Sequence, residues 1–254
     1  MAAHADPEIT LRQMEISPFC DKVRRVLHYK GLPYETREIS LMGLGGLSKI
    51  APPGKVPVLS IGKRNIWDST DICLALEEAF PTPPLIPKDP RARADTLLLE
   101  DWADEALYFF EMTMRFVWTE ERERWSPKLA QADSWPIRRM SPWIVSRLTR
   151  KITHLQGTGR KSRDEIRNDL RRHFASLEAR IGKEGFCVGA DLSLADIAVA
   201  VQIHCISGTS EGQRLLNEHP TLADWKRCVD EMTVPGGDDH TAEGFRRQSG
   251  SFAA

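Results

Sequence analysis

Prolines cluster at one place in the chain and divide it into two parts. Five of the sixteen prolines among its 254 residues fall between Phe80 and Asp95. Proline has no amide donor and its ring clashes with the preceding helical turn, so such a run fits neither a helix interior nor a central strand. The cluster therefore predicts a linker over residues 84–95, with one domain over residues 1–83 and a second over residues 96–254.

The part before the linker alternates strand and helix patterns. Residues typical of strands occupy Ile9–Met14, Tyr34–Ile39, Val56–Ile61 and Asn65–Trp67, and the last two segments predict a hairpin around Gly62. Helical periodicity falls between the first two segments and after the last one. The order is therefore β-α-β, then more irregular chain, then β-β-α.

The part after the linker is almost entirely helical in pattern. Apolar residues spaced for one long buried helix face are Leu98, Trp102, Ala106, Phe109, Met114 and Val117. Two capping-box patterns, Ser162–Glu165 and Ser193–Asp196, predict the starts of further helices. These signals indicate an all-α second domain.

Composition narrows the class of protein. Hydrophobic residues make up 41% and charged residues 28%, which is typical of a globular chain. No apolar run approaches the roughly 18 residues of a membrane span, and the start of the chain lacks a signal-peptide pattern. The five cysteines show neither Cys-x-x-Cys pairs nor zinc-finger spacing. We therefore expect a cytoplasmic protein without a membrane span, a disulfide framework or a bound metal.

Charge is distributed unevenly along the chain. Residues 137–172 hold eleven basic residues against three acidic ones, although the whole chain has a net charge of only -1. Such a run is usually a solvated helix face, and it can also receive an anionic ligand or partner. The segment carries no nucleic-acid-binding motif, so a nucleic-acid partner is not expected.

A candidate anion site lies where the first strand gives way to a helix. Ser17 precedes Pro18, a favourable first helical residue, and the helix is expected to end at Gly31. The Ser17 hydroxyl and the first amide groups would then lie at the positive end of the helix dipole. An ordinary N-cap explains the same residues. Cys20, in the first turn, is either an activated thiol or a small buried residue.

Two further segments have a similar double interpretation. Pro57 begins an apolar strand, where an edge position or a cis peptide would leave the Val56 backbone available to a bound peptide. A simple strand-initiating turn is the alternative. Asp68 and Ser69 end the hairpin and start a helix, which places Ser69 at a second anion site or at an ordinary cap.

Taken together, these segments resemble the soluble glutathione transferase superfamily over nearly the whole chain. The motifs that carry the resemblance are SPFCDKVRRVLHYKGLPY at 17–34, GKVPVL at 54–59, DSTDI at 68–72 and the capping box within Gly189–Asp196. The resemblance implies an α/β domain of thioredoxin-like fold, with a mixed four-stranded sheet, followed by an all-α helical bundle. It also implies glutathione as co-substrate and a homodimer.

The resemblance also assigns residue roles in the glutathione site. Ser17 would donate a hydrogen bond to the glutathione sulfur, and Val56, before a cis Pro57, would pair with its cysteinyl backbone. Asp68 and Ser69 would hold the γ-glutamyl end. Phe19 and Lys55 would complete the contacts. The segment Leu41–Leu47 offers no basic residue where many members hold the glycine carboxylate.

The function implied is a serine-type glutathione transferase that adds the glutathione thiolate to a small hydrophobic electrophile, a detoxification chemistry. Trp102, Phe109, Phe110 and Met114 are candidates for the second-substrate pocket, and core packing is their alternative role. Two other functions stay open. One is a glutathione-dependent thiol-disulfide or reductive enzyme that uses Cys20. The other is a non-catalytic, transferase-like binding protein.

Overall fold

A computed structural model of the chain describes residues 8–181 and 185–235. It divides into two compact units, residues 1–83 with 234–254 and residues 84–233. Residues 236–254, which the predicted second domain included, lie outside the described residues. Each unit has its own set of secondary-structure elements, and the first unit carries the strands.

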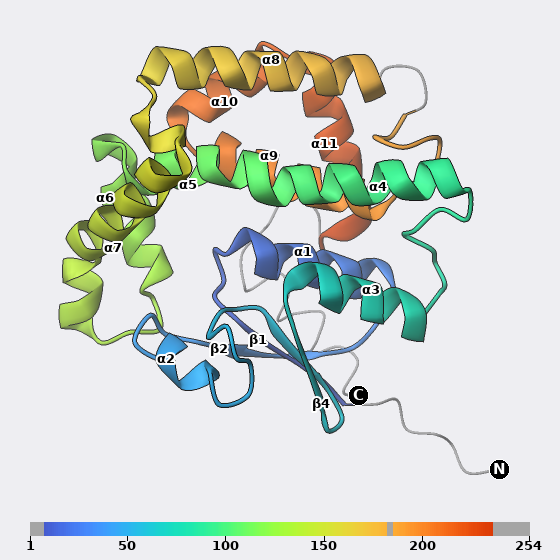
Figure 1. The fold of residues 1–254 in the computed structure, drawn as a ribbon, viewed down its shortest axis with the longest axis horizontal. Coiled ribbons are helices and arrows are strands. Elements are labelled where there is room, and N and C mark those ends of the chain that lie inside the picture. The colour runs from blue at the N-terminus through green and yellow to red at the C-terminus, as the bar shows by residue number, and fades with distance from the viewer. Residues whose placement is uncertain (1–7, 182–184, 236–254) are drawn as a thin grey trace. The chain divides into compact units, whose positions relative to one another are not determined.

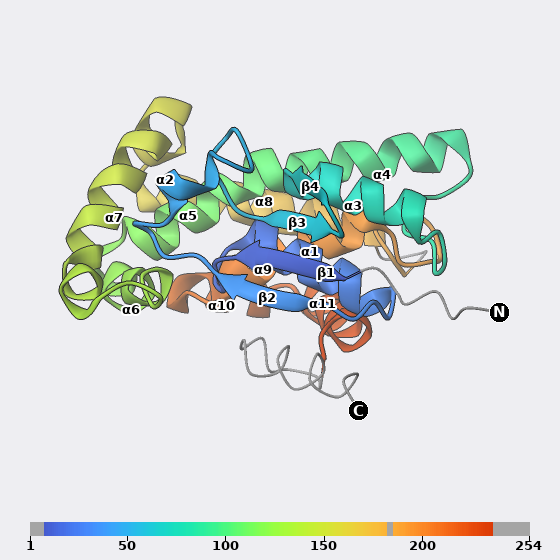
Figure 2. The same cartoon turned by 90° about the horizontal axis from the view of Figure 1, so that it is seen from below.

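The first unit is built on a mixed four-stranded sheet (Figure 2). Its strands are β1 (Ile9–Gln13), β2 (Glu35–Glu38), β3 (Val58–Ile61) and β4 (Arg64–Trp67). Their order across the sheet is β2-β1-β3-β4, with β1 and β2 parallel and the other pairs antiparallel. This confirms the mixed sheet that the resemblance implied.

Two helices cover this sheet (Figure 1). They are α1 (Pro18–Tyr29) and α3 (Ser69–Ala79), which also contact each other, and a short helix α2 (Leu44–Leu47) precedes β3. Leu11 and Leu59 of the sheet are fully buried, as are Val23 and Leu27 of α1 and Leu76 of α3. Burial of such side chains supplies about 1.5–3 kcal/mol each, so this layer holds the strand ends in place.

The second unit is helical, as predicted. Its α-helices are α4 (Pro90–Trp102), α5 (Tyr108–Phe116), α6 (Thr119–Leu129), α7 (Trp135–Gln156), α8 (Arg163–Ile181), α9 (Leu194–Ser207), α10 (Ser210–Asn217) and α11 (Pro220–Thr233). Almost every residue of α9 is buried, and it contacts α4, α5, α10 and α11. A helix that is apolar on all sides in this way belongs at the centre of a bundle.

Both predicted capping boxes are present. Ser162 and Glu165 exchange hydrogen bonds at the start of α8. Ser193 and Asp196 do the same at the start of α9. The carboxylate of Asp196 is fully buried and also accepts hydrogen bonds from the Cys187 amide at 2.7 Å and the Trp225 indole at 3.2 Å. It therefore ties the central helix to two other parts of the bundle.

Two expectations for this unit need correction. The predicted linker over 84–95 is too long, because α4 begins at Pro90, where proline needs no amide partner and Asp89 caps the Ala92 amide at 2.8 Å. The single long face over 98–117 is also wrong. A π-helical segment, Ala103–Leu107, separates α4 from α5, and Leu98 is 69% exposed.

Candidate active site at one end of the sheet

The strand register brings the three predicted glutathione-binding segments to the same end of the sheet. Arg12 of β1 lies opposite Val58 of β3, and Val58 lies opposite Trp67 of β4. The chain therefore leaves β1, enters β3 and leaves β4 at one end, which places Ser17, Val56 and Asp68 in the loops there. Residues 12 to 51 positions apart in sequence meet through backbone pairing alone.

Ser17 lies at the N-cap of α1. Its backbone is extended, with φ -74° and ψ 124°, and its carbonyl accepts the Asp21 amide at 2.9 Å. Its hydroxyl makes no cap hydrogen bond to the helix, and Pro18 occupies the first helical position. The side chain is half-buried. The first turn of α1 thus keeps its amide dipoles directed toward this end of the sheet.

Cys20 is fully buried on the same helix. Burial raises the pKa of its thiol to about 11, and a hydrogen bond with the Ser17 hydroxyl and the charge of Arg24 only partly offset that rise. A thiol in this state is not a nucleophile near pH 7. The interpretation of Cys20 as a small buried residue is confirmed.

The peptide bond between Val56 and Pro57 is cis, as the resemblance implied. Pro57 is buried, Val56 is half-buried and Lys55 is exposed. Because β3 begins only at Val58, the Val56 backbone stands outside the ladder. Neither its amide nor its carbonyl has a backbone hydrogen-bond partner among the described residues. An extended peptide could pair with both groups.

Asp68, not Ser69, caps α3. The Asp68 carboxylate accepts the Thr70 amide at 2.9 Å, and its backbone has φ 71° and ψ 130°, a conformation that L-residues rarely adopt. Such strain costs about 1–3 kcal/mol and is concentrated at functional sites. Ser69 is buried at the first helical position, and the buried Lys22 of α1 lies 3.4 Å from the Thr70 hydroxyl.

A hydrogen-bonded network that the sequence did not indicate supports the loop before Ser17. The Glu38 carboxylate accepts hydrogen bonds from the Gln13 side chain at 2.5 Å and the Glu15 amide at 3.2 Å. Arg24 donates to the Gln13 side chain at 2.7 Å and to the Glu15 carbonyl at 2.9 Å. Burial raises the pKa of Glu38 despite these hydrogen bonds. Only the parallel pairing of Gln13 with Glu38 brings these groups together.

The four predicted second-substrate residues do not form one group. The rings of Trp102 and Phe110 each pack edge-to-face on His173 of α8, at 5.5 and 5.6 Å. Phe109 packs on Tyr108 at 5.4 Å, and Met114 is fully buried. The π-helical segment explains why the four residues are separated. Its extra residue places Phe110, rather than Phe109, on the same side of the helix as Trp102.

Comparison with known protein families identifies the family of this chain. A model described as glutathione S-transferase, N-terminal domain, matches residues 11–84, and one described as glutathione S-transferase, C-terminal domain, matches residues 160–225. The two matches cover more than half of the chain. The chain belongs to the glutathione transferase superfamily. Among the described residues of this transferase-superfamily chain, no group of three or more His, Cys, Asp or Glu side chains could hold a metal ion.

The curated relatives of this superfamily member align with different shares of its length. Glutathione S-transferase DHAR3, chloroplastic, of Arabidopsis thaliana is 41% identical over 69 residues, which is 27% of each chain. Maleylacetoacetate isomerase of Pseudomonas aeruginosa is 27% identical over 190 residues, 72% of this chain and 74% of the isomerase. For three of the curated relatives, the matched part spans only 27% to 44% of their length.

A solved structure shows the same fold. The glutathione transferase homolog from Drosophila mojavensis with bound glutathione superposes with a TM-score of 0.63 at 18% identity, and the match covers 96% of both chains. At this identity the likeness establishes the fold shared by the two proteins. It extends over both units, including the helical part between the two family-model matches.

Proposed function

We propose that this protein is a serine-type glutathione transferase in which Ser17 donates a hydrogen bond to the glutathione thiolate. The observation that carries the proposal is the convergence of Ser17, the unpaired Val56 backbone and the strained Asp68 cap at one end of the sheet. Each is an ordinary turn or cap when taken alone. A tripeptide with a thiol in the middle needs all three.

Each part of glutathione has a partner in this proposal. The Val56 amide and carbonyl pair with the cysteinyl backbone, as an added strand would. Asp68 and Ser69 hold the γ-glutamyl end, whose amino group suits the exposed Asp68 carboxylate. Phe19 and Lys55 complete the contacts. The thiol then lies beside the Ser17 hydroxyl and the N-terminus of α1.

The activation required of Ser17 can be sized. A free thiol with a pKa near 8.5 is about 3% ionised at pH 7, and lowering its pKa to about 6.5 makes it roughly 75% ionised. The change needs about 2.7 kcal/mol of differential stabilisation. A hydroxyl hydrogen bond and a helix N-terminus together supply that amount. The thiolate population rises about 25-fold, which sets the scale of the Ser17 contribution.

The remaining features of the proposal come with the superfamily. The second substrate is a small hydrophobic electrophile, and Trp102, Phe109, Phe110 and Met114 are its candidate contacts, although three of them are engaged by His173 or fully buried. The domains divide at residue 83, and the protein is a cytoplasmic homodimer active in detoxification. The burial of Cys20 argues against its use as the nucleophile of a reductive enzyme.

Replacement of Ser17 tests the proposal directly. Ser17→Ala is expected to lower the conjugation rate at pH 7 by about 25-fold while glutathione affinity stays within a few-fold, because only thiolate stabilisation is lost. Titration of the thiolate absorbance of bound glutathione should show a raised thiol pKa. Cys20→Ala is the matched control on the same turn and should conjugate at the parent rate. An unchanged thiol pKa in Ser17→Ala would show that Ser17 does not activate glutathione.

The alignment with maleylacetoacetate isomerase favours one second candidate, a glutathione-assisted isomerisation. Both reactions begin with addition of the thiolate at the site described above. They differ in the fate of glutathione, since conjugation consumes one thiol per product formed and isomerisation returns it. Loss of free thiol, measured against substrate turnover, distinguishes the two.

A further inference from the structure

Helix α7 presents its apolar side chains to solvent. The residues that it buries are small or polar, and they are Ser141, Val145, Ser146, Thr149 and Thr153. The large apolar residues Met140, Ile144, Leu148 and Leu155 recur every four or seven residues and are 39% to 73% exposed. We call these four residues the apolar stripe. Helices of globular proteins normally turn such a stripe toward the core, so this face of α7 has no packing partner among the described residues.

A row of cations runs beside the apolar stripe. Arg147, Arg150 and Lys151 lie on α7, which contains five basic residues and no acidic one. Successive helical residues are rotated by about 100°, so Arg147 and Lys151 lie about 40° apart on one side of Leu148, and all three are exposed. These three cations have no ion-pair partner among the described residues, as the ion pairs and the additional interactions there do not include them.

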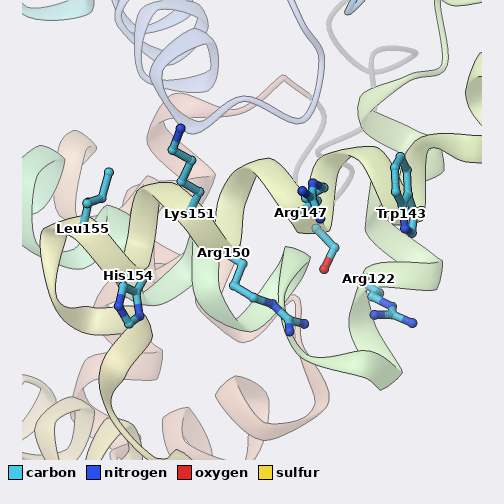
Figure 3. A pocket seen from close by; sticks show the side chains of 8 residues that line it. Arg122, Trp143, Arg147, Arg150, Lys151, His154 and Leu155 are labelled. Carbon is cyan, nitrogen blue, oxygen red and sulfur yellow. The ribbon is translucent and has the colours of Figure 1, made fainter.

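The cations line a cavity of about 660 Å³ on the surface of the second unit (Figure 3). Arg122 of α6 faces this space together with Arg147 and Arg150, and Trp143 forms one end of it. His154 and Leu155 lie at the other end. Among the residues that the structure describes, no carboxylate lines the cavity, so an anionic group that entered it would meet positive charge and one exposed indole.

We propose that α7 docks on the surface of an anionic phospholipid bilayer. The apolar stripe would enter the boundary between headgroups and acyl chains, and Arg122, Arg147, Arg150 and Lys151 would receive lipid phosphates in the cavity. Adjacent apolar and cationic faces with Trp are the pattern of helices that lie in the membrane interface. No helix of the described residues is long and apolar enough to cross a membrane.

Charge favours a bilayer over other occupants. A second copy of the chain would bring a second row of unpaired cations against the first, which costs energy instead of neutralising it. A nucleic acid would satisfy the cations but leave the apolar stripe in water. An anionic bilayer covers both faces at once, and it does so along the 22 residues of α7, about 33 Å of helix.

Vesicle sedimentation tests the proposal. The full chain is mixed with two kinds of vesicle. One contains phosphatidylcholine alone, and the other contains phosphatidylcholine with roughly 30 mol% phosphatidylserine. We expect binding to the mixed vesicles only, weakened about 10-fold or more between low and high salt. The triple variant Arg147→Glu, Arg150→Glu, Lys151→Glu should lose this binding. The pair Ile144→Ser and Leu148→Ser should lose most of it without changing the charge.

The matched control reverses three exposed cations elsewhere in the second unit. Lys88→Glu, Arg91→Glu and Arg93→Glu change the net charge equally and leave α7 intact. This variant should bind vesicles within a few-fold of the parent, and circular dichroism should show that all variants are folded. Equal loss in both triple variants would overturn the proposal, as would absence of binding at low salt. A dimer that dissociates in Leu148→Ser would instead assign the apolar stripe to a second copy. Glutathione conjugation is measured separately and does not enter this test.

Discussion

Helices α7 and α8 come from the same basic stretch of sequence and use their charges in opposite ways. In α8, acidic residues alternate with the arginines, and Arg163 pairs with Glu120, Arg167 with Glu211 and Arg171 with Glu218. Its large apolar residues are all buried, and they are Ile166, Leu170, Phe174, Leu177 and Ile181. In α7 the apolar stripe is exposed and the cations Arg147, Arg150 and Lys151 lack partners among the described residues.

The difference shows what helical periodicity leaves undecided. Large apolar residues recur every three or four positions in α8 and every four or seven positions in α7, so both helices are amphipathic. Periodicity does not say whether the apolar side meets the core. In α7, five small or polar residues occupy the side that packs against α5 and α6. These side chains fill the inward side of the helix, so the larger apolar side chains lie on the outer side. Acidic partners, present in α8 and absent from α7, are the second distinguishing signal.

The largest expected difference between the helices is in stability. Leu170→Ala in α8 removes a fully buried side chain and should lower the free energy of unfolding by about 2–5 kcal/mol, since it creates a cavity. Leu148→Ala in α7 makes the same chemical change at a site that is 59% exposed. Its effect should stay within about 0.5 kcal/mol. Urea titration followed by circular dichroism measures both.

A large loss of stability in Leu148→Ala would contradict the comparison. It would mean that the apolar stripe is covered in solution by protein, so that α7 and α8 do not differ in the way described. Repeating the titration over a range of protein concentrations then identifies a second copy as the cover, because only an intermolecular contact depends on concentration.

An intermediate difference is expected in the response to pH. Burial opposes ionisation of Glu211, but hydrogen bonds from Arg214 and Arg167 leave its pKa below the ordinary value. A carboxylate whose pKa is lowered by folding stabilises the protein above its unfolded pKa, and this contribution is lost as the pH falls through the folded pKa. Arg167→Gln should therefore cost about 1 kcal/mol at pH 7, and its difference from the parent should shrink below about pH 4.

The matched substitution on α7 is Arg147→Gln. Arg147 faces no carboxylate of the described residues in its cavity, so this variant should differ from the parent by a similar small amount at pH 7 and pH 4. A difference that disappears at low pH would indicate a hidden carboxylate partner for Arg147. Unfolding free energies of the two variants at three pH values decide between these outcomes.

Much of the first unit follows from local sequence signals, whereas much of its site does not. Ser17, Pro18 and Gly62 are turn and cap residues whose chemistry is local, and they lie where the pattern predicted. The cis bond before Pro57 came from the resemblance. Glu38 was missed because its contact with Gln13 depends on strand register. The π-helical segment at 103–107 shifted the aromatic residues because one inserted residue leaves no clear trace in periodicity.

The smallest expected difference between the helices is one of sign. Arg147 and Lys151 are four residues apart on α7, so their like charges repel, and Lys151→Glu should replace repulsion with attraction and raise the free energy of unfolding by about 0.3–0.5 kcal/mol. Arg172 of α8 donates a hydrogen bond to Asp169 at 2.7 Å. Arg172→Glu should therefore lower the free energy of unfolding by about a few tenths of a kcal/mol. Replicate chemical unfolding at low ionic strength resolves such values, and added salt should reduce both.

If both substitutions destabilise the protein, the α7 cations are engaged by a partner within the folded chain, and the contrast with α8 fails. Opposite signs mean instead that the α7 charges reduce the stability of the isolated protein, which is the behaviour expected of a surface whose partner lies outside it.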